Sequence, residues 1–418
     1  MKAAERRLGL IHRLSKAIPD YRTPGKIEHT HEEILCQRIF AIACGHPDCN
    51  DAAHLSNDPV HKILAGRTEK DAPALASQST LSRFENSLCA VDLYRMADTL
   101  ADTIIEHHRR RLHGRARRIT LDLDPTEDPT HGQQELTFYS GFYRSHCYLP
   151  LLGFMTFDTE PDQYLFAAML RPGNAPALKG SIPVIKRILS KLRDAFPKAE
   201  VLVRLDGAFA CEELFSFLES ENVKFVVNMA KNSILKKKAE KLMRKARRKS
   251  KASGETENEF GECKYSAKKW SRKRRIIIKA EKTVHPGRPA RDNPRFVVTN
   301  LTQTPRYVFK KKYCKRGDAE NRIKELKDLH IDRTSCTSFL ANQFRILLTM
   351  AAFALMQEIR ARAARTTMAR AQVSTIIQKL IKIGVQVTVS VRRIIFELPR
   401  ACPERNAFIQ IARALATE

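Results

Sequence analysis

Four acidic side chains stand where they could hold metal ions. Asp122 and Asp124 lie at alternate positions in the segment ITLDLD, and Asp206 follows the apolar run VLVRL. Glu320 lies much later, in a polar segment of helical character. Carboxylate oxygens are ligands that Mg²⁺ prefers, and two such ions about 4 Å apart catalyse phosphoryl transfer. The acids therefore predict a site for breaking or joining phosphodiester bonds, provided that the fold brings them together.

Glu320 shares one face of a predicted helix with an aromatic and two cationic side chains. The segment YCKRGDAENRIKELK (313–327) places Tyr313, Arg316, Glu320 and Lys327 at offsets 0, 3, 7 and 14. At about 100° per residue these four fall within roughly 60° of one another. Beside a metal-binding acid, the cations and the tyrosine hydroxyl would contact DNA phosphates. The alternative is a solvated stripe with ion pairs worth about 0.3–0.5 kcal/mol each.

The segments around the acids predict a mixed sheet covered by helices. Alternating or continuous apolar runs indicate strands, and a 3.6-residue period indicates helices. The resulting β-β-β-α-β-α-β order is that of a ribonuclease-H-like α/β fold, in which the first and fourth strands are neighbours and their acids can meet. The elements are strands at 119–124, 149–158 and 164–173, a helix at 181–196, a strand at 201–209, a helix at 211–220 and a strand at 224–230.

The sequence leaves the first metal ligand open between two aspartates. Residues two apart point to the same face of a strand, so either Asp122 or Asp124 could face the site. We favour Asp124 because it ends the strand, directly before Pro125. The other aspartate would then cap the turn that follows.

The start of the helix that carries Glu320 is a second open point. The pattern places it near Tyr313. Gly317 costs a helix about 1 kcal/mol, so the helix could also begin only near Asp318.

The composition indicates a folded protein with a polyanionic partner. The 418 residues are 43% apolar and carry a net charge of +28, which favours nucleic acid first and an acidic membrane second. The longest apolar stretch, about 346–356, is too short to span a membrane, and the N-terminus lacks a signal-peptide core. The ten cysteines are scattered as in reduced proteins, and Cys44 and Cys49 lack a second pair to complete a zinc site. We expect a cytoplasmic protein, bound to nucleoid DNA and not to a membrane.

Pattern and charge divide the chain into regions. The segment SQSTLSRFEN places Arg83 near a helix start, with Ser82 and Glu85 spaced as a capping box; a DNA-recognition helix or any capped helix would look like this. From Lys231 to Lys279 there are 19 Lys and Arg against five Asp and Glu. The expected regions are a helical N-terminal DNA-binding region at 1–117, a catalytic domain at 118–231 and 313–365, a basic β-rich insertion at 232–312, and a C-terminal region at 366–418 that could dimerise and holds a strand pair or one extended strand at 385–398.

Taken together, these motifs resemble the DDE transposases of bacterial insertion sequences, closest to the insertion-sequence-1380 family. The signature Y-x2-R-x3-E-x6-K of the wider insertion-sequence-4-like group is complete from Tyr313 to Lys327. LDLDPTEDPTHGQQE (121–135) resembles the first-Asp block, RLDGAFA (204–210) the second, and LRPGN (170–174) the loop after the third strand. RRIIIKAEK and PRFVVTNL resemble the insertion, and SQSTLSRFEN the N-terminal region.

The resemblance covers roughly residues 35–360 and implies cut-and-paste DNA transposition, with Asp124, Asp206 and Glu320 as the metal triad. It implies two Mg²⁺ ions, for which Mn²⁺ could substitute. Water would attack first and the freed 3′-hydroxyl next, on double-stranded DNA carrying terminal inverted repeats and on target DNA. A homodimer would hold the two ends. Gly207 stands where relatives often carry a small hydroxyl residue, a departure that leaves the ligand intact.

The resemblance also implies DNA-end contacts in the insertion, where relatives sometimes have a base-stacking tryptophan. Trp270 is the only tryptophan and lies in the basic segment YSAKKWSRKRR. Stacking of a base on its ring would contribute about 1–3 kcal/mol; the alternative is a core tryptophan. The predicted DNA contacts are Tyr313, Arg316, Lys327, Trp270, Lys269, Arg272, Arg274 and Arg83.

A DNA-binding protein without chemistry is the alternative function, as an inactive or domesticated relative. Such a protein would lose affinity steeply with salt, at a slope near −0.9 per phosphate contact, and would be indifferent to Glu320. The three acids and the complete signature favour the enzyme. A metal nuclease of another fold is disfavoured by the order of strands and helices.

Overall fold

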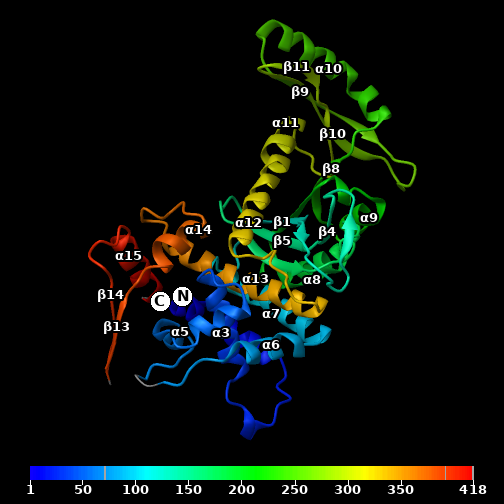
Figure 1. Ribbon diagram of the computed structural model, residues 1–418. Helices are drawn as coiled ribbons and strands as arrows, with labels where there is room; N and C mark the ends of the chain where they lie inside the picture. Colours follow the sequence, from blue (N-terminus) through cyan, green and yellow to red (C-terminus); the bar gives the residue numbers. More distant parts are fainter. Residues whose placement is uncertain (70–71, 391, 417–418) are drawn as a thin grey trace.

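A nine-stranded mixed sheet runs through the body of the molecule and on into a wing above it (Figure 1). The computed structural model describes residues 1–69, 72–390 and 392–416. The strand order is β11-β10-β12-β8-β7-β1-β5-β6, and β9 also pairs with β10. β7 is parallel to both β1 and β8, and the other pairs are antiparallel. The body strands are β1 (Arg118–Pro125), β5 (Leu151–Phe157), β6 (Tyr164–Met169), β7 (Glu200–Leu205) and β8 (Lys224–Met229).

The body of the sheet confirms the predicted order of elements. Helices α8 (Ser181–Ala195) and α9 (Glu212–Ser220) separate β6, β7 and β8 as expected. β1 is buried on both faces, with Leu121 and Leu123 on one face and Asp122 on the other. The first and fourth predicted strands, β1 and β7, are parallel neighbours. This pairing brings the two aspartate-bearing strand ends to one edge.

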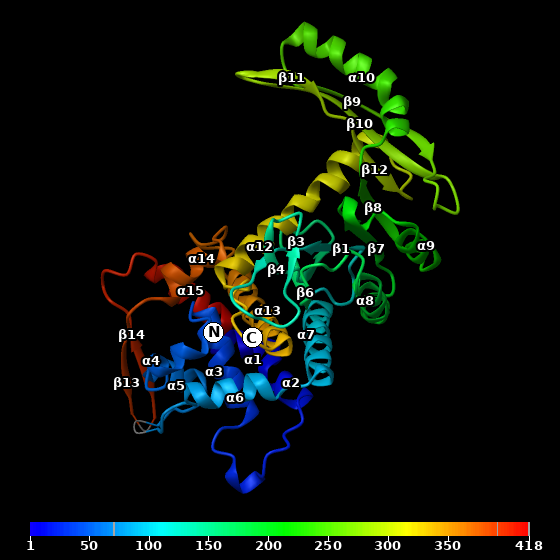
Figure 2. The same cartoon turned by 45° about the vertical axis from the view of Figure 1, so that its right-hand side comes forward.

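The insertion forms a wing that continues the same sheet. It begins with the long helix α10 (Ser233–Ser253). The prediction of a β-rich insertion did not include this helix. Leu235, Ala239 and Met243 recur every four residues and are buried where α10 packs on β9 and β10. β12 pairs with β8, so the wing is joined to the body by backbone hydrogen bonds (Figure 2). The wing strands are β9 (Glu257–Tyr265), β10 (Arg274–His285), β11 (Arg288–Asp292) and β12 (Arg295–Thr299).

One continuous helical segment leads from the wing back across the body. It starts at Pro305, earlier than either predicted start, because Thr304 and Pro305 supply an N-cap position and a first-turn proline. Gly317 adopts helical angles, φ −56° and ψ −18°, and does not interrupt the segment. Its parts are α11 (Pro305–Tyr307), the π-helix η4 (Val308–Tyr313), the 3₁₀ turn η5 (Cys314–Arg316) and α12 (Gly317–Asp328).

The region before β1 is helical, as predicted, and packs on the central helix α13 (Phe339–Arg362). The capping box proposed for Ser82 and Glu85 is wrong. Ser77 caps α6 (Gln78–Ser87), and the side chain of Glu85 is buried and paired with Arg38 and Arg345. The helices are α1 (Lys2–Leu8), α2 (Leu10–Ala17), η1 (Pro24–Lys26), α3 (His31–Ala43), η2 (Cys49–Asp51), α4 (Ala52–Leu55), α5 (Pro59–Leu64), α6 (Gln78–Ser87) and α7 (Ala90–Arg111).

The C-terminal region returns to the N-terminal helices. The strand pair expected at 385–398 is present as β13 and β14, and α15 packs on α1 and α13 (Figure 2). α13 alone among the described helices is long and apolar enough to cross a membrane, but most of it is buried in the protein. The C-terminal elements are α14 (Val373–Ile376), the π-helix η6 (Ile377–Ile381), β13 (Gln386–Val389), β14 (Ile394–Glu397) and α15 (Arg405–Ala416).

Candidate active site

The parallel pairing of β1 and β7 places two predicted ligands side by side. Asp122 lies opposite Arg204 in this register, so Asp124 and Asp206, each two residues further along, lie at neighbouring positions where the pairing of the two strands ends. Asp124 is the last acid of β1 and is largely buried. Asp206 caps the short turn η3 (Gly207–Phe209), where its Oδ1 accepts a hydrogen bond from the Ala208 N–H at 3.0 Å.

The helical segment 305–328 brings the third acid over these two. Glu320 lies in the first turn of α12, with its side chain 60% exposed. Between it and the sheet lies Arg316, whose guanidinium contacts Asp124 Oδ1 at 2.7 Å and Glu320 Oε1 at 3.3 Å. A π-helix and a 3₁₀ turn directly before α12 set the rotation at which these side chains face the sheet. Arg316 therefore bridges the first and third predicted ligands.

Asp124 lies in surroundings that disfavour its negative charge. Burial raises the pKa of Asp124 to about 6; Arg316 opposes the rise, and Asp206 and Glu320 add to it. In the described part of the chain, no three His, Cys, Asp or Glu side chains form a ready metal-binding group. The oxygen donors suit a hard divalent cation, and Arg316 supplies positive charge in their midst. The carboxylates are therefore suitable ligands for Mg²⁺, and Arg316 would have to move away from them for the ion to bind.

Asp122 is committed to a different contact. It is fully buried and paired with Arg204, whose Nε donates to Oδ1 at 2.8 Å, and Gln163 Nε2 donates to Oδ2 at 2.9 Å. Arg204 also donates to the Lys312 carbonyl at 3.1 Å, tying the sheet to the helical segment above it. Both carboxylate oxygens of Asp122 thus have protein partners, which leaves Asp124 the freer of the two.

The remaining signature residues flank the acids on the same helical segment. Tyr313 is half-buried against Phe309, with ring centroids 5.3 Å apart. Burial raises the pKa of its hydroxyl, and Arg316 lies close enough to oppose the rise. Lys327 donates to the Glu127 carbonyl at 3.4 Å, two residues beyond the end of β1. The four residues of the predicted face therefore turn toward the edge of the sheet that holds Asp124.

A family model matches this chain over its full length. The model for the transposase DDE domain, group 1, matches residues 1–418. The chain belongs to this family of DDE transposases. No curated protein was found to match it.

In this DDE transposase the wing residues that were predicted to contact DNA are of two kinds: some pack inside the protein and others lie on its surface. Trp270 packs edge-on against Phe215 and Tyr265, with centroids 5.1 and 5.7 Å apart, as a core tryptophan would. Arg274 is buried and bridges Glu212 and Glu219, with contacts of 2.6 and 2.9 Å. The guanidinium of Arg274 is therefore occupied in holding α9 to β10, which disfavours the predicted DNA contact.

The other predicted DNA contacts lie on the surface. Arg272 is 59% exposed and pairs with Glu219. Lys269 is exposed beside Trp270. Arg83 is exposed on α6, where it donates to the Ser79 carbonyl at 3.3 Å. These three side chains can reach a polyanion without breaking the core.

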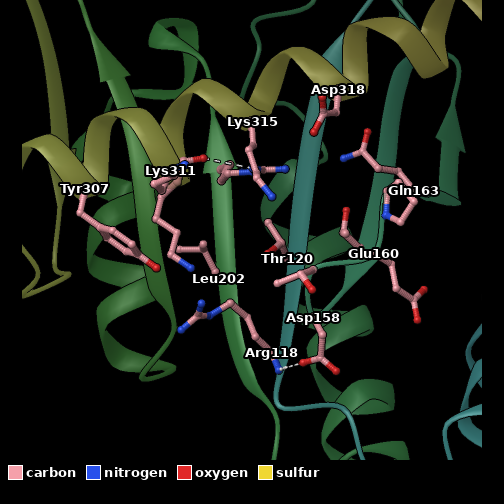
Figure 3. A pocket seen from close by; sticks show the side chains of 15 residues that line it. Arg118, Thr120, Asp158, Glu160, Gln163, Leu202, Tyr307, Lys311, Lys315 and Asp318 are labelled. Atoms are coloured by element: carbon pink, nitrogen blue, oxygen red, sulfur yellow. Dashed lines mark hydrogen bonds between the residues drawn. The ribbon is translucent and has the colours of Figure 1, made fainter.

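A cationic pocket lies beneath the helical segment, on the other side of the Asp122–Arg204 pair from Asp124. Its volume is about 270 Å³. Figure 3 shows Lys311 and Lys315 on the helix above the pocket, with Leu202 and Thr120 on the strands below. Burial lowers the pKa of Lys312, and nearby Arg118 adds to this effect. Neither the sequence motifs nor the resemblance pointed to this pocket.

A small sheet that sequence reasoning missed stands beside the acids. Its strands are β2 (Asp128–Pro129), β3 (Phe138–Ser140) and β4 (Ser145–Tyr148), in the order β2-β4-β3. The segment TFYSGFYRSHCY, with a Ser-Gly turn between aromatic stretches, was the available signal.

The ten cysteines are free, and both Cys44 and Cys49 are buried.

Proposed function

We propose that this DDE transposase moves an insertion sequence of the 1380 family by cutting and pasting DNA at terminal inverted repeats. Its catalytic domain would be a ribonuclease-H-like unit over 118–231 and 313–365. The register of β1 and β7, which pairs Asp122 with Arg204 and so aligns Asp124 with Asp206, carries the proposal. The protein would act on DNA in the bacterial cytoplasm.

Asp124, Asp206 and Glu320 are the proposed holders of two divalent cations, Mg²⁺ or Mn²⁺. When bound, such ions make the attacking oxygen more nucleophilic and stabilise the charge on the leaving oxygen. The acids gather negative charge at the end of β1, and Arg316 can then turn from them to a DNA phosphate. Water is the first nucleophile at the end of the element, and the freed 3′-hydroxyl is the second, at the target.

The proposed DNA path follows the cationic face of the helical segment 305–328. Tyr313 and Lys327 flank the acids, and Lys311 and Lys315 line the pocket beyond them. Phosphate contacts of this kind fix the position of a duplex without reading its sequence. Residues 1–117, with Arg83, and the basic wing, with Lys269 and Arg272, would bind the inverted repeats. Residues 366–418 would support a homodimer that holds two ends.

Cleavage of the element's own ends tests the proposal. Purified protein and Mg²⁺ are added to DNA bearing the inverted repeats that flank its gene, and products are resolved on a sequencing gel. We expect cutting at the repeat boundary by native protein, and DNA binding without cutting by Glu320→Gln. The matched control is Asp328→Asn, an exposed acid on the same helix, which should cut like native protein.

Two other results would overturn the proposal. If native protein and Glu320→Gln bind alike and neither cuts, the chain is a DNA-binding protein without chemistry. If both cut alike, Glu320 holds no metal, and the face of α12 is a solvated stripe.

A further inference from the structure

Three exposed aromatic rings stand on the small sheet beside the candidate acids. We call residues 138–146, which comprise β3, its turn and the start of β4, the aromatic hairpin. Phe138 is 40% exposed, Tyr139 56% and Phe142 86%. Tyr139 lies edge-on to His146 at 5.5 Å, and Phe142 to Tyr143 at 4.8 Å. Exposed rings gathered in this way mark an interaction site more often than a structural need.

The base of the aromatic hairpin is firmly held. Gly173, in the LRPGN motif, packs so closely that a Cβ would overlap the Cys147 carbonyl oxygen and lie 2.5 Å from that of Phe138. Arg171 is buried and donates to the Leu149 carbonyl at 2.8 Å. Tyr148 donates its hydroxyl hydrogen to the Glu135 carbonyl at 2.6 Å. A fixed base presents the rings in one position, while the rings themselves add little to the core.

The tip of the aromatic hairpin lies at the candidate active site. Ser145 donates to Glu127, whose carbonyl accepts from the signature residue Lys327. Tyr143 is within electrostatic reach of Asp124 and Asp206. A phosphodiester held at these acids would therefore bring its neighbouring nucleotides to the rings.

We propose that the aromatic hairpin stacks on unpaired bases at the DNA end held at Asp124, with Phe142 as the principal contact. This inference rests on the proposed function. Bases stack on exposed aromatic rings with little regard to sequence, and such platforms combine rings with cations that follow the backbone. Arg144 stands next to the rings in the turn, and the exposed His146 adds a second polar group to this surface. This mixture suits nucleotides better than the apolar face of a second protein.

The test compares DNA ends with and without unpaired bases. Full-length protein, without divalent metal, is titrated into inverted-repeat DNA that carries 2-aminopurine either in a three-nucleotide overhang or in a blunt, fully paired end. Native protein should quench the overhang probe and bind the overhang DNA about tenfold more tightly than Phe142→Ala does. Phe142→Trp should retain both effects. Phe142→Leu, which keeps an apolar side chain but has no ring to stack on a base, is the matched control and should lose both effects as Phe142→Ala does.

The possible failures are distinguishable. Phe142 is 86% exposed, so circular dichroism should show Phe142→Ala to be folded. If that variant quenches and binds like native protein, the stacking role is wrong while the proposed function stands. If it instead turns a native dimer into a monomer by light scattering, with unchanged quenching, the rings contact a second copy and the inference is overturned. If native protein binds neither DNA, the proposed function fails and this inference with it.

Discussion

Arg316 contacts Asp124 at 2.7 Å across 192 residues of sequence, and the same guanidinium reaches Glu320 at 3.3 Å. An arginine therefore lies between two acids that are proposed to hold metal. At 4 Å, two unit charges interact by about 1–4 kcal/mol in surroundings between water and protein surface. The arginine stabilises the acids without metal and competes with a cation that would bind them.

Replacement of Arg316 should accordingly affect metal binding and catalysis in opposite directions. Without DNA, Arg316→Ala should bind Mn²⁺ about fivefold or more tightly than native protein, because a competing cation is gone. With DNA, its cleavage should fall about 100-fold, because a phosphate contact is lost. Titration followed by electron paramagnetic resonance measures the first effect and single-turnover cleavage the second. Lys186→Ala, an exposed cation on α8, should change neither, and unchanged Mn²⁺ affinity in Arg316→Ala would contradict the competition.

The buried pair Asp122–Arg204 should matter for stability. Asp122→Asn leaves a buried guanidinium without its counter-charge, which costs about 3–5 kcal/mol. Urea unfolding measures this loss. The double variant Asp122→Leu/Arg204→Met removes both charges and should recover most of it. Molecules of Asp122→Asn that remain folded should still cut DNA, whereas Asp124→Asn should not; a catalytic loss equal in the two would make Asp122 a metal ligand.

Local patterns were enough to predict the strands of the body and the neighbouring positions of Asp124 and Asp206. β1 alternates, β7 is a short apolar run that ends in Asp206, and right-handed crossovers in an α/β chain leave few arrangements of such strands. The face formed by Tyr313, Arg316, Glu320 and Lys327 followed from helical spacing alone. These features depend on neighbours in sequence or on general rules of topology.

Contacts between distant residues could not be predicted in this way. No pattern in the sequence near Asp122 indicates that both of its carboxylate oxygens accept hydrogen bonds from Arg204, 82 residues away. In the sequence Arg274 is one basic residue among many, and only the structure shows that it pairs with Glu212 and Glu219. The sequence of α10 has apolar residues at every fourth position, which is a helical pattern. The prediction for this segment rested on its many lysines and on DNA binding, and so did not include the helix.

Arg274 should prove to be a structural residue of the wing. It lies over the rings of Phe215 and Trp270 as well as between two glutamates, so Arg274→Ala should lower the free energy of unfolding by about 1–3 kcal/mol. Arg272→Ala removes an exposed partner of Glu219 and should cost no more than about 0.5 kcal/mol. Urea unfolding compares the two, and DNA affinity is measured where both are folded. Greater loss of affinity than of stability in Arg274→Ala would restore it as a DNA contact.

Asp128 should make the protein less stable as the pH rises. It is fully buried; Thr334 donates to its Oδ2 at 2.8 Å, and its Oδ1 has no partner among the described residues. Burial raises its pKa to about 7. The folded state then holds a proton that the unfolded state has lost, so stability falls between about pH 4 and pH 7 and stays low above it. Asp128→Asn should be about 4 kcal/mol more stable than native protein at pH 8 and nearly equal at pH 4, by urea unfolding. Asp194→Asn, an exposed acid on α8, should leave the pH dependence unchanged, and a native-like slope in Asp128→Asn would show that another group is responsible.

Gly173 should be required for the placement of the small sheet beside the acids. A Cβ there meets two backbone carbonyl oxygens, of Cys147 and Phe138, and neither can rotate away as a side chain would. Gly173→Ala should therefore shift the hairpin and lower the free energy of unfolding by about 1–3 kcal/mol. Gly141→Ala is the matched control, because this glycine lies in the same hairpin with open space around its Cβ position and should change stability by less than about 0.5 kcal/mol. Urea unfolding gives the stabilities. If Gly173→Ala is as stable as Gly141→Ala, the LRPGN loop is free to move and does not hold the hairpin against the site.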